Sequence, residues 1–120
     1  MARYNTKVTL NPGTPINVQT ALGLENNANL ANRLFIQMAT GGTGLGYVMG
    51  GIGGGRTPAT TNANDVTAEL APASATAPGG DYTDGGGGIQ FSLTPGIDLS
   101  TYWIDGTAAD PVRISADINV

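Results

Sequence analysis

Apolar and polar residues alternate along several stretches of the chain, which is the pattern of a β-strand with one buried face. The longest alternation runs from Val112 to Val120, where valine, isoleucine and alanine are interleaved with polar residues. Residues 89–94 alternate in the same way between a run of glycines and Pro95. Both stretches are predicted to be half-buried strands.

Shorter patterns predict further strands. Leu34, Ile36 and Met38 share one side of residues 33–39, and this run ends in a Thr-Gly-Gly turn signal. The apolar run Tyr47–Met49 is enclosed by glycines and is expected to pair back across that turn. Weaker strand candidates are residues 7–10, 16–22, 66–70 and 101–104. About eight short strands predict a single all-β domain over residues 1–120, an antiparallel β-sandwich or barrel of the jelly-roll kind.

Helix signals are few. Residues 26–34 are compatible with one or two helical turns, and Asp98-Leu99-Ser100 with one tight turn, because Asp and Ser side chains bond to nearby backbone N–H groups. Two long stretches, 50–64 and 72–88, are predicted to be glycine-rich loops. Loops of that length in a small domain usually serve function or become ordered by a partner.

The composition excludes several classes of function. The chain of 120 residues has five Lys and Arg against nine Asp and Glu, a formal net charge of -4, and no basic run, so no nucleic-acid partner is expected. Cysteine and histidine are absent, which excludes the usual zinc sites, thiol nucleophiles, disulfides and Ser/His/Asp triads. There is neither a signal-peptide core nor an apolar stretch of membrane-spanning length. We therefore expect synthesis in a cytoplasm and no membrane partner.

The stretch GGIGGGRT, residues 50–57, has the spacing of a phosphate-binding P-loop, with Arg56 where that motif has lysine. Arginine is bulkier and planar, no long helix signal follows, and no βαβ pattern surrounds the stretch. A dinucleotide fingerprint fails as well, because Met49 stands at the position of its third glycine. No nucleotide or other cofactor is expected.

Other candidate chemistry is equally weak. The acidic turn 81–85 lacks the ligand pattern of a calcium loop, so a solvated turn is favoured and no metal is expected. A hydrolase needs two carboxylates that converge on a cleft, whereas most Asp residues here sit beside turns and are expected to bond to the backbone. Tyr102 and Trp103 are candidates for stacking on a sugar. Because neighbouring strand residues point to opposite sides, one of the two is expected in the core and the other at the rim. No catalytic residue is predicted.

Short motifs follow one another in a recognisable order. They are TKVTL at 6–10, RLFIQ at 33–37, GYVMG at 46–50, ELAP at 69–72, IDLSTYWIDG at 97–106 and DPVRI at 110–114. In this order they resemble the small β-rich virion structural proteins of tailed bacteriophages, a resemblance that spans most of the chain. The chain departs from the pattern in its inserts 50–64 and 73–88 and at Met49. The resemblance implies a structural, non-enzymatic role.

The function expected from this resemblance is that of a capsid decoration or cement protein, which binds the outer surface of the shell and bridges capsomers. Its partner would be the major capsid protein, and its location the virion after synthesis in the host bacterial cytoplasm. Two alternatives stay open, a neck, tail or fibre-base component and a carbohydrate-binding β module that uses Tyr82, Tyr102 or Trp103. A homo-oligomer is expected, with a trimer favoured because the glycine-rich loop would let chains approach near an axis.

The predicted interface residues lie in three segments of the chain. Residues 1–11 are interpreted as an extended docking arm, and the other two segments are the glycine-rich loop and the acidic turn. The residues are Arg3, Tyr4, Lys7, Gly51, Gly53, Gly54, Gly55, Arg56 and Tyr82.

Overall fold

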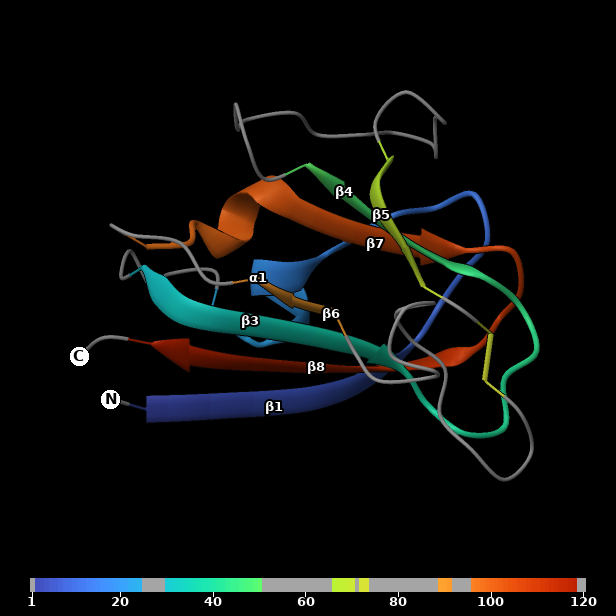
Figure 1. Cartoon of the computed structure of the whole chain (residues 1–120), viewed down its shortest axis with the longest axis horizontal. Coiled ribbons are helices and arrows are strands. Elements are labelled where there is room, and N and C mark those ends of the chain that lie inside the picture. The colour runs from blue at the N-terminus through green and yellow to red at the C-terminus, as the bar shows by residue number, and fades with distance from the viewer. Residues whose placement is uncertain are drawn as a thin grey trace.

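The computed structural model describes residues 2–24, 30–50, 66–70, 72–73, 89–91 and 96–118, and most of them are in β-strands (Figure 1). One four-stranded sheet has the order β1-β8-β3-β6, formed by Ala2–Thr9, Pro111–Ile118, Ala31–Met38 and Ile89–Phe91. The other has the order β2-β7-β4-β5, formed by Ile16–Asn17, Tyr102–Gly106, Gly46–Gly50 and Val66–Leu70. Helix α1 spans Val18–Ala21, and a 3₁₀ helix spans Leu99–Thr101.

The strand pairs are antiparallel and nested. Strand β1 pairs with β8, β2 with β7, β3 with β6 and β4 with β5. The pairs β3–β8 and β4–β7 then join these antiparallel pairs side by side into the two sheets. Because β1 and β8 are paired, Ala2 lies opposite Ile118, so the first and last described residues are neighbours (Figure 1).

The hydrophobic core lies between the two sheets. From the first sheet it takes the buried side chains of alternate residues, Leu34, Ile36 and Met38 on β3 and Val112, Ile114, Ala116 and Ile118 on β8. From the second sheet it takes Val48 of β4 and Ile104 of β7. The period of two that is visible in the sequence is therefore the period of burial, and each large aliphatic side chain buried in this way contributes about 1.5–3 kcal/mol of transfer free energy.

Most of the strand predictions are confirmed within the described residues. The alternation from Val112 corresponds to β8, residues 33–39 to β3, Tyr47–Met49 to β4 and residues 66–70 to β5. Residues 89–91 and 102–106 form the strands β6 and β7, and residues 98–101 make the predicted tight turn. The predicted loops 50–64 and 72–88 lie outside the described residues, apart from Gly50, Pro72 and Ala73.

Two local predictions are wrong. Residues 16–22 form only a two-residue strand before α1, because the Asn17 side chain accepts a hydrogen bond from the Thr20 N–H at 3.1 Å and caps the helix. Residues 31–34 are strand and not helix. There Ala31 exchanges backbone hydrogen bonds of 2.8 and 2.7 Å with Ile97, so pairing with distant segments overrides the local preference.

The predicted hairpin between residues 33–39 and Tyr47–Met49 is also wrong. Strands β3 and β4 lie in different sheets, and Tyr47 pairs with Asp105 and Glu69. The connection after β3 crosses from one sheet to the other, so the glycines that indicated a tight turn serve this crossing instead. The alternative of a closed barrel is wrong too, because the described strands form two separate sheets with open edges.

Residues 2–9 of the predicted docking arm form β1, which pairs along its whole length with β8. Strand β1 is the end strand of its sheet, so one of its edges has no strand partner among the described residues. Its burial alternates between half-buried and exposed residues. A role of this segment in docking stays a prediction.

Ile114→Asp should prevent folding. Ile114 is 1% exposed and faces the core between β1 and β3, so an aspartate there would bury an unpaired charge, which costs several of the ~5–15 kcal/mol that stabilise a typical domain. Ser115→Asp adds the same charge on the opposite side of β8 and should leave the protein folded. Circular dichroism and thermal melting test both variants, and equal melting temperatures would contradict the assignment of the two faces.

Candidate interaction surface

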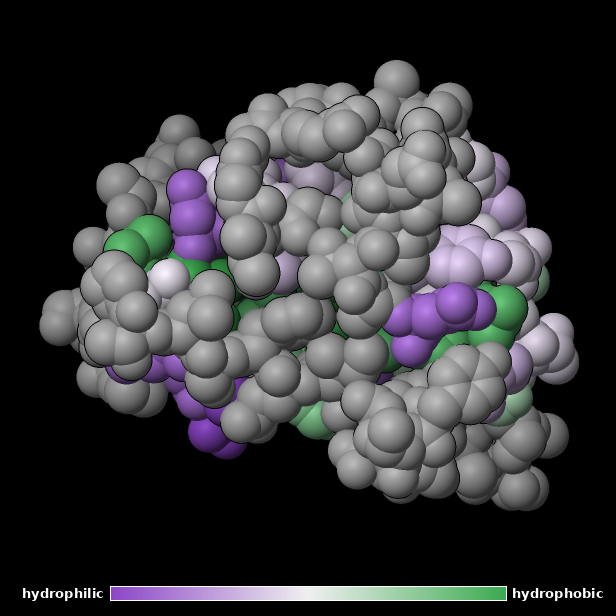
Figure 2. Space-filling view, turned by 45° about the horizontal axis from the view of Figure 1, so that its top comes forward, coloured by the Kyte–Doolittle hydropathy of each residue, from purple (hydrophilic) through white to green (hydrophobic). Residues whose placement is uncertain are grey.

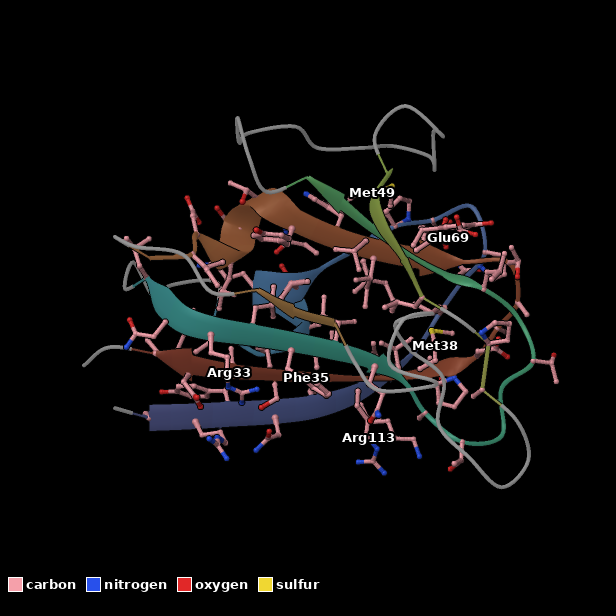
Figure 3. The ribbon with its side chains drawn as sticks, viewed as in Figure 1. Arg33, Phe35, Met38, Met49, Glu69 and Arg113 are labelled. Atoms are coloured by element: carbon pink, nitrogen blue, oxygen red, sulfur yellow. The ribbon has the colours of Figure 1, made fainter. Side chains whose placement is uncertain are left out.

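The outer side of the first sheet gathers most of the positive charge of the protein. Because residues alternate between its two sides, Arg3 and Lys7 on β1, Arg113 on β8 and Arg33 on β3 all lie away from the core. They are four of the five Lys and Arg residues in the chain. We call this surface the basic face and define it by these four residues together with Asn5, Ser115, Asp117, Phe35 and Gln37. Figure 3 shows Arg113 pointing away from the second sheet and Met38 lying on the side towards it.

At one end of the basic face, Asp117 lies between two arginines. Its Oδ1 is 2.8 Å from Nε of Arg3, and its Oδ2 is 2.8 Å from Nε of Arg33. The register causes this arrangement, since Asp117 is opposite Arg3 on β1 and Arg33 on β3. The side chains of Arg3, Arg33 and Asp117 are 64%, 23% and 11% exposed. Hydrogen bonds from Arg3 and Arg33 lower the pKa of Asp117 from 3.8 to about 2.

Arg33 lies at the centre of the basic face and contacts several of its residues. Its Nη2 donates a hydrogen bond of 3.0 Å to the Ser115 hydroxyl, and its guanidinium carbon lies 5.9 Å from the centre of the Phe35 ring. At that distance a cation is attracted to the face of an aromatic ring. The guanidinium is thus fixed by Asp117, Ser115 and the Phe35 ring together, and a half-buried aromatic ring lies beside it on the outer side of the sheet.

At the other end of the basic face, two positive charges lie directly opposite each other. Lys7 on β1 pairs in register with Arg113 on β8, and both side chains are exposed. Within the described part of the chain, neither has an ion-pair or hydrogen-bond partner. Like charges that face each other across a strand pair destabilise a sheet. As far as the described residues show, this end of the face is therefore electrostatically unfavourable.

The structure brings together two of the residues predicted from sequence, Arg3 and Lys7, on one face. Tyr4 lies on the other side of β1 and packs against the core, so it does not share that surface. Of the remaining predicted interface residues, Gly51, Gly53, Gly54, Gly55, Arg56 and Tyr82 lie outside the described residues. Sequence reasoning missed Arg33, Phe35 and Arg113. The alternation placed Arg113 on the solvent side of its strand, but only the register places it next to Lys7.

Three other carboxylates bond to the backbone, as the sequence led us to expect. Asp98 caps the 3₁₀ helix by accepting the Ser100 N–H at 3.0 Å, and Asp105 accepts the Gly13 N–H at 3.1 Å. Asp110 accepts the N–H groups of Thr43 and Gly44 at 3.3 and 2.7 Å. These bonds hold turns and crossings in place and do not bring a pair of carboxylates to a cleft.

The crossing from β3 to β4 is packed closely around Asp110. A Cβ atom at Gly44 would lie 2.5 Å from the Thr107 hydroxyl oxygen, so only glycine fits there without a shift. That hydroxyl accepts the Leu45 N–H at 2.9 Å, and the Asp110 carbonyl accepts the Leu10 N–H at 2.8 Å. Asp110 therefore links the segments that follow β1 and β3 to its own segment between β7 and β8.

The expectation for the aromatic pair is confirmed. Tyr102 is 3% exposed and belongs to the core, where burial raises the pKa of its hydroxyl, whereas Trp103 is half-buried on the opposite side of β7. Tyr102 is thus not available for stacking on a sugar. Tyr82 lies outside the described residues.

Large hydrophobic residues contribute little to the described surface. Among the described residues, Leu30 is the only large hydrophobic residue that is exposed, with 40% of its surface accessible to solvent. Where described residues are visible in Figure 2, the strongly hydrophobic ones appear only in small areas. Among the described residues there is also no helix long and apolar enough to cross a membrane, and no group of three potential metal ligands. The basic face is therefore the most distinctive surface in this part of the chain.

Comparison with known proteins adds no relative. No protein-family model matches the chain, and no curated protein or solved structure matches it. A functional assignment consequently depends on the fold and the surface chemistry of the chain itself.

Asp117 should make stability depend on acid pH. Because its folded pKa of about 2 lies below the ordinary 3.8, its contribution is fully present above about pH 4 and is lost as the pH falls towards 2. Urea unfolding at pH 5 and pH 2 should show Asp117→Asn less stable than the original chain at pH 5, with the difference shrinking at pH 2. A difference that stays constant over this range would show that the carboxylate charge is not what stabilises the cluster.

Asp110→Ala should reduce the free energy of unfolding by about 1–3 kcal/mol, because it leaves the N–H groups of Thr43 and Gly44 without their acceptor. Asp110→Asn keeps an acceptor oxygen and nearly the same shape, so it should cost less. Chemical denaturation of both variants measures the difference. Equal losses would mean that packing, and not the hydrogen bonds, is what Asp110 supplies.

Proposed function

We propose that this chain is a non-enzymatic structural protein of a bacteriophage virion, specifically a capsid decoration or cement protein. It would bind the outer surface of the assembled shell, contact the major capsid protein and stabilise the contacts between capsomers. A homo-oligomer on the shell, with a trimer favoured, is part of the same proposal.

The nested strand pairing is the observation that carries this proposal. The pairs β1–β8, β2–β7, β3–β6 and β4–β5, folded over into two sheets, are the connectivity of a jelly-roll sandwich. Jelly rolls recur in viral capsid domains. The fold supports the proposal by analogy, in agreement with the motif order that resembles small virion proteins.

The roles of the carboxylates among the described residues give further support to a non-enzymatic function. Asp98, Asp105 and Asp110 bond to the backbone, and Asp117 is held by two arginines, so these carboxylates serve the fold. A cement protein requires a stable body with matched surfaces and no reacting groups. Among the described strands, β1 has one edge without a strand partner, and its backbone groups would be available for strand addition by a neighbouring chain.

Two alternatives predict different results. A neck, tail or fibre-base component would have the same β body but occur in few copies. A carbohydrate-binding module is suggested by the jelly roll itself, which is also a lectin fold. Because Trp103 is the only tryptophan of the chain, a change in tryptophan fluorescence on adding glycans would favour that module.

The proposal is tested by the copy number of this chain in purified particles of the virus that encodes it. Quantitative mass spectrometry against the major capsid protein should give a ratio near one to one if the chain decorates the lattice. A few to a dozen copies per particle would assign it to the neck or tail. Complete absence from particles would refute a virion role.

A further inference from the structure

We propose that the basic face is the docking surface of this protein and that its partner is an acidic protein surface. This inference rests on the proposed function, because it places the acidic surface on the outside of the capsid shell. It deepens that proposal by naming the face that docks and the chemistry that recognises it.

The distribution of charge is the first argument. The chain has a net charge of -4, yet four of its five cationic side chains lie on the outer side of one sheet. The only carboxylate among the described residues on that side is Asp117, which is already bound by Arg3 and Arg33. A face of opposite sign to the whole molecule orients the chain towards an acidic surface before contact.

The Lys7–Arg113 pair is the second argument. These exposed like charges face each other in register, and within the described residues no carboxylate neutralises them. In a chain with only 12% charged residues, such a pair is unfavourable for the isolated fold. A carboxylate of a partner placed between the two side chains would remove the repulsion, just as Asp117 does between Arg3 and Arg33 at the other end of the face.

The centre of the face fits a protein partner. Phe35 is half-buried, and Arg33 beside it is fixed by Asp117 and Ser115. Aromatic and arginine side chains that are already held in place are the residues that contribute most to binding energy in protein interfaces. The polar side chains of Asn5 and Gln37 flank this centre.

Two other occupants fit less well. Nucleic acid would meet a small positive area on a molecule whose other ionisable residues are nearly all acidic. A second copy joined through the same face by two-fold symmetry would place the four cations against four others. An acidic protein surface satisfies the charges without either conflict.

The experiment uses three variants. Lys7→Glu reverses one charge of the face and gives Arg113 a cross-strand partner. Glu69→Lys reverses an exposed charge on β5, in the other sheet (Figure 3). The double variant Lys7→Glu/Glu69→Lys restores the formal net charge of -4 while the face stays altered. It therefore separates an effect of the face from an effect of total charge.

Binding is measured to two probes, immobilised poly-L-glutamate and empty shells assembled from the major capsid protein of the same virus. For Lys7→Glu and for the double variant we expect at least about tenfold weaker binding to both probes, because a charge pair has become a repulsion. Glu69→Lys should bind like the original chain. The melting temperature of Lys7→Glu should meanwhile rise by ~1–5 °C, because the repulsion with Arg113 becomes an attraction.

Several outcomes would overturn the proposal. Unchanged binding of Lys7→Glu to both probes would show that this face does not dock, and recovery of binding in the double variant would show that only total charge matters. Tighter binding of the original chain to oligo(dT) than to poly-L-glutamate would assign the face to nucleic acid. Self-association that Lys7→Glu abolishes, measured by sedimentation velocity, would assign it to a second copy.

The two probes also separate this proposal from the proposed function. If the chain binds shells and Lys7→Glu binds them equally well, the decoration role stands and the docking face is wrong. If poly-L-glutamate binding depends on Lys7 and shells bind none of the variants, an acid-binding face stands and the decoration role is wrong.

Discussion

The register of β8 with its two neighbours is the constraint on which both faces of the first sheet depend. Strand β8 pairs over its whole length with β1 on one side and over residues 112–118 with β3 on the other, where the register shifts once between Ala31 and Arg33. Because side chains alternate, this register places Ile114 in the core and Asp117 between Arg3 and Arg33. A shift by one residue on either side would expose the aliphatic residues and bury the charges, so the hydrophobic core and the ionic cluster select the same register.

The connections between strands depend on a different use of charge. In a chain with few charged residues, Asp98, Asp105 and Asp110 lie at the turns and crossings and accept hydrogen bonds from backbone N–H groups. Two of them, Asp105 and Asp110, are buried, where an N–H group without an acceptor would be costly. Since these three acids serve the interior or the caps, Asp117 is the only described carboxylate that balances the cations on the outer face of the first sheet.

The sequence predicted the strands well because burial and alternation have the same cause. It did not predict which strands pair, since a period of two tells only which residues share a side of one strand. The sequence therefore predicts that Tyr47–Met49 pairs with the preceding strand, whereas in the structure it pairs with β5 and β7. The candidate surface was missed for the same reason. The sequence alone indicates Arg3 and Lys7 as charges of an N-terminal arm, but Arg33 and Arg113 join them only through strand pairings that span most of the chain.

Lys7 also bears on how an end strand is protected. Charged side chains on end strands discourage edge-to-edge aggregation, and Lys7 and Arg3 on β1 are placed to do this. Edge protection depends on the presence of a charge, and a glutamate at position 7 would supply one while also stabilising the pair with Arg113. Protection alone therefore does not explain why two cations face each other there. A positive sign at both positions is what an acidic partner requires, and the instability of the isolated pair is removed when such a partner binds.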